Sequence, residues 1–164
     1  MVTNFHELYE KYAQDVYRFA YWLCGNAQDA EDITSETFVR ALTSVGEIKA
    51  ETVKAYLLTI ARNLTYKRSN REKRFVPLDA NTAEPSMGPA QVAENSARLR
   101  TAMQFIQSFL EIDRAALVLR LQDDLSYAEI AAVLNISLAS AKVKVHRARL
   151  KLSEYMQQQE EQQP

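Results

Sequence analysis

Residues 126–149 read SYAEIAAVLNISLASAKVKVHRAR and predict a helix, a tight turn and a second helix. Ser126 and Glu129 have the serine-then-glutamate spacing of a capping box, which opens a helix. Asn135 tolerates the left-handed backbone that a tight turn needs, and Ser137 is a good cap for the helix that follows. The order matches a helix-turn-helix, which places its second helix in the major groove of DNA.

The second helix of this motif has an apolar side and a cationic side. Its apolar residues recur at helical spacing and are expected to face a core: Ala141, Val145, Ala148 and Leu152. The other positions form the candidate DNA-contacting face: Ser140, Lys142, Val143, His146, Arg147 and Arg149. A solvated basic face on a helix that only packs is the alternative. The caps, the turn residue and the charge together favour DNA binding.

The rest of the chain also predicts helices. Apolar residues recur at three- and four-residue steps from Phe5 to Leu23, and Gly25 then favours a left-handed C-cap. A second helix is expected from near Gln28, and a third follows the polar loop Gly46 to Thr52. Further on, we expect one helix marked by Leu99, Met103, Ile106 and Leu110, and another over 114–122, capped by Asp113, with Leu117 and Leu121 inward. With only 3 Gly and 4 Pro, the predicted fold class is all-α.

The predicted organisation is two small helical domains joined by a flexible linker. Residues 1–75 form the first domain, and residues 97–158 form a four-helix domain that contains the helix-turn-helix. Residues 76–96 hold three of the four prolines and few large apolar residues, so they cannot bury enough surface to fold alone. Residues 159–164 form a polar tail.

Charge is segregated along the chain, although the formal net charge is only -1. Residues 1–50 carry mostly Asp and Glu, whereas cations dominate residues 54–74 and 142–151. This pattern indicates that the chain uses different surfaces to bind different partners. The basic third helix offers a second candidate DNA surface: Arg62, Asn63, Tyr66, Lys67 and Arg68. Asn pairs with adenine and Tyr stacks on unpaired bases, but a basic helix end that satisfies its own dipole is an equal alternative.

The second helix is acidic, with Asp29, Glu31, Asp32 and Glu36. A metal site needs ligands converging from several segments, and no other segment supplies them, so we expect no metal. Flanked by Phe38 and Leu42, the helix better suits docking of a basic protein partner. The sequence has no glycine-rich phosphate loop and no nucleophile elbow, so we expect no cofactor and no enzymatic activity.

Two further features bear on the setting in which the chain works. Cys24 is the only cysteine, which excludes an intrachain disulfide. The sequence also shows no secretion signal and no long apolar run, so the chain is expected in the cytoplasm without membrane insertion.

Three segments together resemble the extracytoplasmic-function class of bacterial sigma-70-family factors: DAEDITSETFVRAL (29–42), KAYLLTIARNLTYKRSNR (54–71) and LSYAEIAAVLNISLASAKVKVHRARLKL (125–152). The order and separation of the segments also match. The resemblance implies an RNA polymerase sigma factor that binds the clamp helices and flap of core RNA polymerase and promoter DNA. It also implies an anti-sigma factor as a further partner.

The resemblance assigns a role to each surface. Asp29, Asp32 and Glu36 with Phe38 match the polymerase-docking motif. The five residues of the basic third helix match the element that reads and melts the −10 promoter element, and Gly46 to Thr52 matches the place where a flipped base is held. The six residues of the last helix match positions that contact the −35 element.

The chain departs from the family pattern at four positions, Ser35, Asn135, Ala139 and Val143, where the family commonly has Gln, Gly, Gly and Ser. The departures at Ala139 and Val143 leave the −35 base preference open. A helix-turn-helix regulator that does not replace a sigma factor remains the alternative function.

Overall fold

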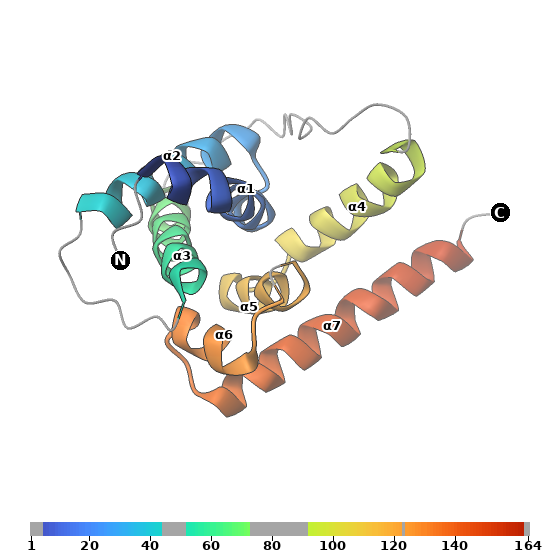
Figure 1. Cartoon of the computed structure of the whole chain (residues 1–164). Coiled ribbons are helices and arrows are strands. Elements are labelled where there is room, and N and C mark those ends of the chain that lie inside the picture. The colour runs from blue at the N-terminus through green and yellow to red at the C-terminus, as the bar shows by residue number, and fades with distance from the viewer. Residues whose placement is uncertain (1–4, 44–51, 73–91, 123, 163–164) are drawn as a thin grey trace.

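A computed structural model describes residues 5–43, 52–72, 92–122 and 124–162. Within these ranges every regular element is a helix: α1 (Phe5–Cys24), α2 (Ala27–Thr43), α3 (Val53–Glu72), α4 (Val92–Gln107), α5 (Glu111–Leu121), α6 (Tyr127–Leu134) and α7 (Leu138–Glu161). Helices α1 to α3 pack together in one half of the molecule, and α5 to α7 pack in the other (Figure 1). The all-α prediction is confirmed.

The junction between α1 and α2 follows from two adjacent residues. Gly25 has φ +71, and its N–H donates to the Tyr21 carbonyl at 2.8 Å, which closes the last turn of α1. The Asn26 Oδ1 then accepts from the backbone N–H groups of Gln28 and Asp29, at 2.8 and 3.1 Å. The expected left-handed C-cap is present, and Asn26 adds an N-cap that starts α2.

The helix-turn-helix is formed as its caps predict. Ser126 and Glu129 exchange both hydrogen bonds of the capping box at the start of α6. Asn135 ends α6 with φ 55 and ψ 50. The Ser137 hydroxyl oxygen accepts from the Ser140 N–H at 3.0 Å at the start of α7. The turn between α6 and α7 is therefore fixed by local side-chain chemistry before any packing is considered.

Replacing Ser126 by Ala is expected to lower the free energy of unfolding by about 1 kcal/mol, because the Glu129 N–H loses its acceptor. Chemical denaturation followed by circular dichroism measures the change. Ser153→Ala is the matched control, because Ser153 is exposed within α7 and caps no helix. Equal stability of the two variants would contradict the capping role.

Several expectations for α4 and α5 were wrong at the helix ends. Helix α4 begins at Val92, inside the segment expected to be linker, and Leu99 is exposed. Helix α5 begins at Glu111 without a side-chain cap, so Asp113 is not its cap. Leu110 and Leu121 are exposed because they flank or end α5, where only its middle is covered by neighbouring helices.

Some predicted features lie outside the described residues. These are most of the loop Gly46 to Thr52 and most of the linker over 76–96. The polar tail is partly described, and α7 continues into it as far as Glu161.

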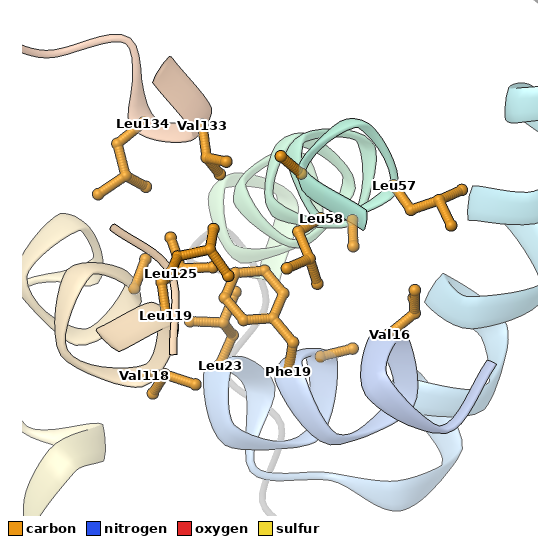
Figure 2. Packing of buried hydrophobic residues seen from close by; sticks show 14 of the residues in the cluster. Val16, Phe19, Leu23, Leu57, Leu58, Val118, Leu119, Leu125, Val133 and Leu134 are labelled. Atoms are coloured by element: carbon orange, nitrogen blue, oxygen red, sulfur yellow. The ribbon is translucent and has the colours of Figure 1, made fainter. Parts of the chain in front are cut away.

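The two halves share one hydrophobic core. Buried residues of α1, α3, α5 and α6 belong to a single cluster, whose members include Phe19, Leu58, Leu119 and Val133. Figure 2 shows the Phe19 ring pointing between Leu58 of α3 and Leu119 and Leu125 of the second half. Phe19 and Leu119 are each 0% exposed. Burial of aromatic and branched side chains on this scale is the main stabilising term in a helical protein.

Polar contacts reinforce the junction at the C-terminal end of α1. The last carbonyls of a helix lack partners within the helix. Here Gln107 Nε2 donates to the Trp22 carbonyl at 2.7 Å, and Arg114 Nη1 donates to the Leu23 carbonyl at 2.6 Å. Arg114 also donates to the carbonyls of Ile106, Gln107 and Phe109. The second half thus caps a helix of the first.

Candidate nucleic-acid interface

The basic face of α7 stands at the surface of the molecule. Helix α7 is anchored by Ala141, Val145 and Ala148, which are at most 2% exposed. On its other side five of the six predicted residues are exposed and Ser140 is half-buried: Lys142, Val143, His146, Arg147 and Arg149. The structure therefore presents the predicted residues together on one face. It leaves them accessible for a groove of DNA to approach.

Lys144 is set apart from the other α7 cations. Its Nζ lies 3.3 Å from Asp113 Oδ1 in α5, and both side chains are about one quarter exposed. This contact explains the role of Asp113, which was expected to cap α5. Lys144 therefore joins α7 to α5, while the cations on the exposed face stay available to a nucleic acid.

The basic end of α3 splits into two groups of side chains. Asn63, Tyr66 and Lys67 are exposed, and the Arg62 guanidinium lies 5.4 Å from the centre of the Tyr66 ring. Arg62 Nη1 also donates to Asn63 Oδ1 at 3.3 Å. These four residues form one polar and aromatic surface, which suits stacking and hydrogen bonding to unpaired bases.

Arg68 is held differently, by the acidic helix α2. Its Nη1 lies 3.1 Å from Asp29 Oδ1, and its Nη2 lies 3.5 Å from Asp32 Oδ2. The contact joins residues 39 apart in the sequence, and no spacing rule could have found it. Arg68 thus joins the acidic surface of α2 to the basic end of α3, two surfaces that were expected to have separate roles.

The carboxylates on the acidic face of α2 form ion pairs with arginines. Glu36 accepts from Arg40, one turn further on, at 2.9 Å. Asp32 keeps 56% of its side chain exposed despite its contact with Arg68. An exposed set of carboxylates held in place by arginines can dock a basic partner. The i, i+4 spacing of Glu36 and Arg40 is itself a sequence signal for this ion pair.

Phe38 does not belong to the exposed part of this face. It is 1% exposed and packs edge-on against Tyr9 of α1, with ring centres 5.0 Å apart. Its assignment to the docking surface therefore has to be corrected, because in this structure it offers a partner no contact area. Phe38 follows Ala30 and Thr34 at four-residue steps along α2, and both of these residues are buried.

The other titratable side chains of the described residues do not cluster into a metal site. Among the described residues, no three His, Cys, Asp or Glu side chains are grouped so that they could hold a metal ion. Cys24 is half-buried, and its Sγ donates to the Asn26 carbonyl at 3.3 Å.

Burial lowers the pKa of Arg114, and Glu111 and Cys24 oppose this shift. No helix within the described ranges combines the length and apolar character needed to cross a membrane.

Comparison with known families accounts for both halves of the chain. The family described as Sigma-70 region 2 matches residues 8–75, and the family described as Sigma-70, region 4 matches residues 100–152. The first match contains α3 and the acidic helix, and the second contains the helix-turn-helix.

Individual relatives agree with these matches. The chain is 35% identical to the ECF RNA polymerase sigma factor SigE of Mycolicibacterium smegmatis, over 94% of this chain and 62% of that protein. It is 30% identical to the ECF RNA polymerase sigma factor SigM of Bacillus subtilis, over 89% of this chain and 91% of that protein. It thus spans nearly all of one relative and under two thirds of the other.

The fold also matches a solved structure. The sigma factor RpoE of Bartonella quintana, in complex with the anti-sigma factor NepR, superposes with a TM-score of 0.76 at 25% identity. The match covers 95% of this chain and 98% of that one, so it includes both halves.

Proposed function

The chain belongs to the extracytoplasmic-function class of RNA polymerase sigma factors, and we propose from this that it directs core polymerase to promoters through three separate surfaces. The acidic face of α2 binds core polymerase through Asp29, Asp32 and Glu36. The face of α3 reads and melts the −10 element, and the basic face of α7 binds the −35 element. No step requires a catalytic group or a cofactor of its own.

The observation that carries this proposal is the pair of accessible basic faces, one in each half of a single chain. On α7 the contacts divide by chemistry: Lys142, Arg147 and Arg149 suit phosphates and guanine edges, and Val143 suits a thymine methyl group. Val143 is 45% exposed, so it can reach a groove. Two weakly binding DNA surfaces on one chain give a higher overall affinity for the promoter when polymerase holds them at the separation of the two promoter elements.

Melting of the promoter DNA is driven by binding of the unpaired bases to the protein. No energy-supplying molecule is needed. The surface of Arg62, Asn63, Tyr66 and Lys67 combines a stacking ring, an amide and cations. Each base that unstacks costs a few kcal/mol, an order of magnitude known from base flipping. Stacking on an aromatic side chain returns roughly 1–3 kcal/mol per base. Captured bases can therefore offset most of the cost of opening the duplex.

The proposal extends to partners and location. The protein works in the cytoplasm, because core polymerase and promoter DNA are there. An anti-sigma factor is a further partner, and the match to a sigma factor bound to NepR supports this. The clamp helices and flap of core polymerase are the surfaces to which the two halves bind.

Run-off transcription with purified core polymerase tests the function. Core polymerase supplied with this chain is expected to start transcripts at defined sites on genomic fragments. A helix-turn-helix regulator that does not replace a sigma factor would start none without another specificity subunit. Absence of transcripts, with a polymerase that remains active with a second sigma factor, would refute the proposal.

Arg147→Ala is expected to weaken binding to the −35 element by about 5- to 150-fold if the guanidinium contacts a base, which corresponds to roughly 1–3 kcal/mol. If it contacts phosphate instead, the slope of log affinity against log salt falls by about one. Holoenzyme binding to −35 duplexes over a salt series measures both quantities. Arg98→Ala removes an exposed cation of α4 as a control, and an equal effect of both changes would remove Arg147 from the interface.

A further inference from the structure

We propose that Arg68 is a positioning residue of the polymerase-docking surface and not a contact to the −10 element. The inference rests on the proposed function, since it concerns how the acidic face of α2 is prepared for core polymerase. Arg68 is the one residue of the predicted −10 group that the structure joins to α2.

The direction of Arg68 on α3 separates it from the other candidates. Successive residues of an α-helix advance by about 100° around its axis. Asn63, Tyr66 and Lys67 consequently fall within one arc of about 100°, and Arg62 adjoins Tyr66. Arg68 lies about 100° beyond Lys67, outside this arc and on the side of α3 that contacts α2. It faces a pocket of about 280 Å³ between the halves, whose lining includes Asp29, Thr65 and Arg114.

Arg68 uses both of its terminal nitrogens in contacts with α2. Its Nη1 donates a hydrogen bond to Asp29 Oδ1 at 3.1 Å, its Nη2 forms an ion pair with Asp32 Oδ2 at 3.5 Å, and the side chain is 33% exposed. A phosphate that approached this guanidinium would also meet two carboxylates. Lys67, the residue that precedes Arg68, is exposed and forms no ion pair with any other described residue. Of the two neighbouring cations, Lys67 is therefore the one open to DNA.

The benefit to docking follows from the arrangement of the carboxylates. Asp29 and Asp32 are three residues apart on α2, so their like charges face one another on the helix surface. Arg68 bridges them, which reduces their repulsion and fixes each side chain in one orientation. Each carboxylate commits one oxygen to Arg68 and keeps the other for a basic partner. Orientation fixed in advance lowers the entropy cost of binding.

The experiment measures two affinities for each variant. One is the affinity of the fluorescently labelled full chain for core polymerase. The other is the affinity of the assembled holoenzyme, at saturating core, for a single-stranded −10 oligonucleotide from a promoter mapped by run-off transcription. Arg68→Gln is compared with Lys67→Gln, which removes the same charge one residue away, and Arg68→Lys keeps the charge should the glutamine variant fold poorly.

Arg68→Gln is expected to weaken core binding about three- to tenfold and to leave the oligonucleotide affinity within about twofold, a size typical of coupling between neighbouring charged residues. Lys67→Gln is expected to do the reverse. In an Asp29→Asn/Asp32→Asn background, Arg68→Gln should have no further effect on core binding. A purely structural role would lower stability without this dependence on the two carboxylates.

Three results would overturn the inference while the proposed function stands. They are weaker oligonucleotide binding by Arg68→Gln at unchanged core affinity, tighter core binding by Arg68→Gln, and full additivity with the two asparagine changes. Tighter binding would mean that Arg68 competes with polymerase for the carboxylates. If neither the wild-type chain nor Lys67→Gln binds core polymerase at all, the proposed function fails, and this inference fails with it.

Discussion

Reversing the charge of Asp32 and Glu36 together, to Arg, is expected to abolish run-off transcription by lowering affinity for core polymerase at least about 100-fold. Two attractions to a basic partner become repulsions, and like charges brought together at an interface cost several kcal/mol. Asp32 is 56% exposed and Glu36 is 43% exposed, so both carboxylates can meet a partner directly. The binding constant for core polymerase and the run-off yield are the two measurements.

The second half of the chain should be unaffected by this change. Binding of the −35 duplex by the free variant is therefore expected to match or exceed that of the wild type, because fewer acidic groups repel phosphate. Glu154→Arg/Glu161→Arg introduces the same charge difference at exposed positions of α7, away from α2. If that control loses core binding to the same degree, general charge is responsible and α2 is not the docking surface.

Short-range features of the fold were predictable, and those that join distant segments were not. The capping box of Ser126, the left-handed Asn135 and the cap at Ser137 depend on residues within a few positions of one another, so the sequence carries their full pattern. Contacts such as Arg114 with the Leu23 carbonyl join residues 91 apart. Neither partner has a pattern that marks it for the other, because a backbone carbonyl is present at every residue.

The candidate surfaces also divide into features that local sequence predicts and features that depend on distant segments. All six residues assigned to the α7 face share one side of a helix, because the spacing of Ala141, Val145 and Ala148 sets its buried side. On α2 the family resemblance assigned Phe38 to the docking surface, whereas it is buried against Tyr9. Phe38 follows the buried residues Ala30 and Thr34 at four-residue steps, so the helical period pointed to the buried side and the resemblance did not.

Phe19→Ala is expected to lower the free energy of unfolding by about 3–5 kcal/mol, the cost of removing a fully buried aromatic side chain. Phe19 is 0% exposed and belongs to the cluster that both halves share. Domains of this size have a total free energy of unfolding of about 5–15 kcal/mol, so Phe19→Ala removes a large part of the stability of the protein. Denaturant unfolding followed by circular dichroism measures it, with Phe5→Ala, at a 46% exposed position of the same helix, as control.

Because the core is shared, the effect of Phe19→Ala should reach the half of the molecule in which the residue does not lie. Amide hydrogen exchange of α6 and α7 is expected to accelerate together with that of α1 to α3, since slow exchange reports the opening of a cooperative unit. Leu119→Ala, made in α5, should accelerate exchange in α1 in return. The double variant should lose less stability than the two single changes added, because Phe19 and Leu119 face each other in Figure 2 and neighbouring positions are not independent. Exchange that accelerates only in the mutated half would mean that the contact seen between the halves contributes little to stability, and the two would then have to be treated as separate folding units.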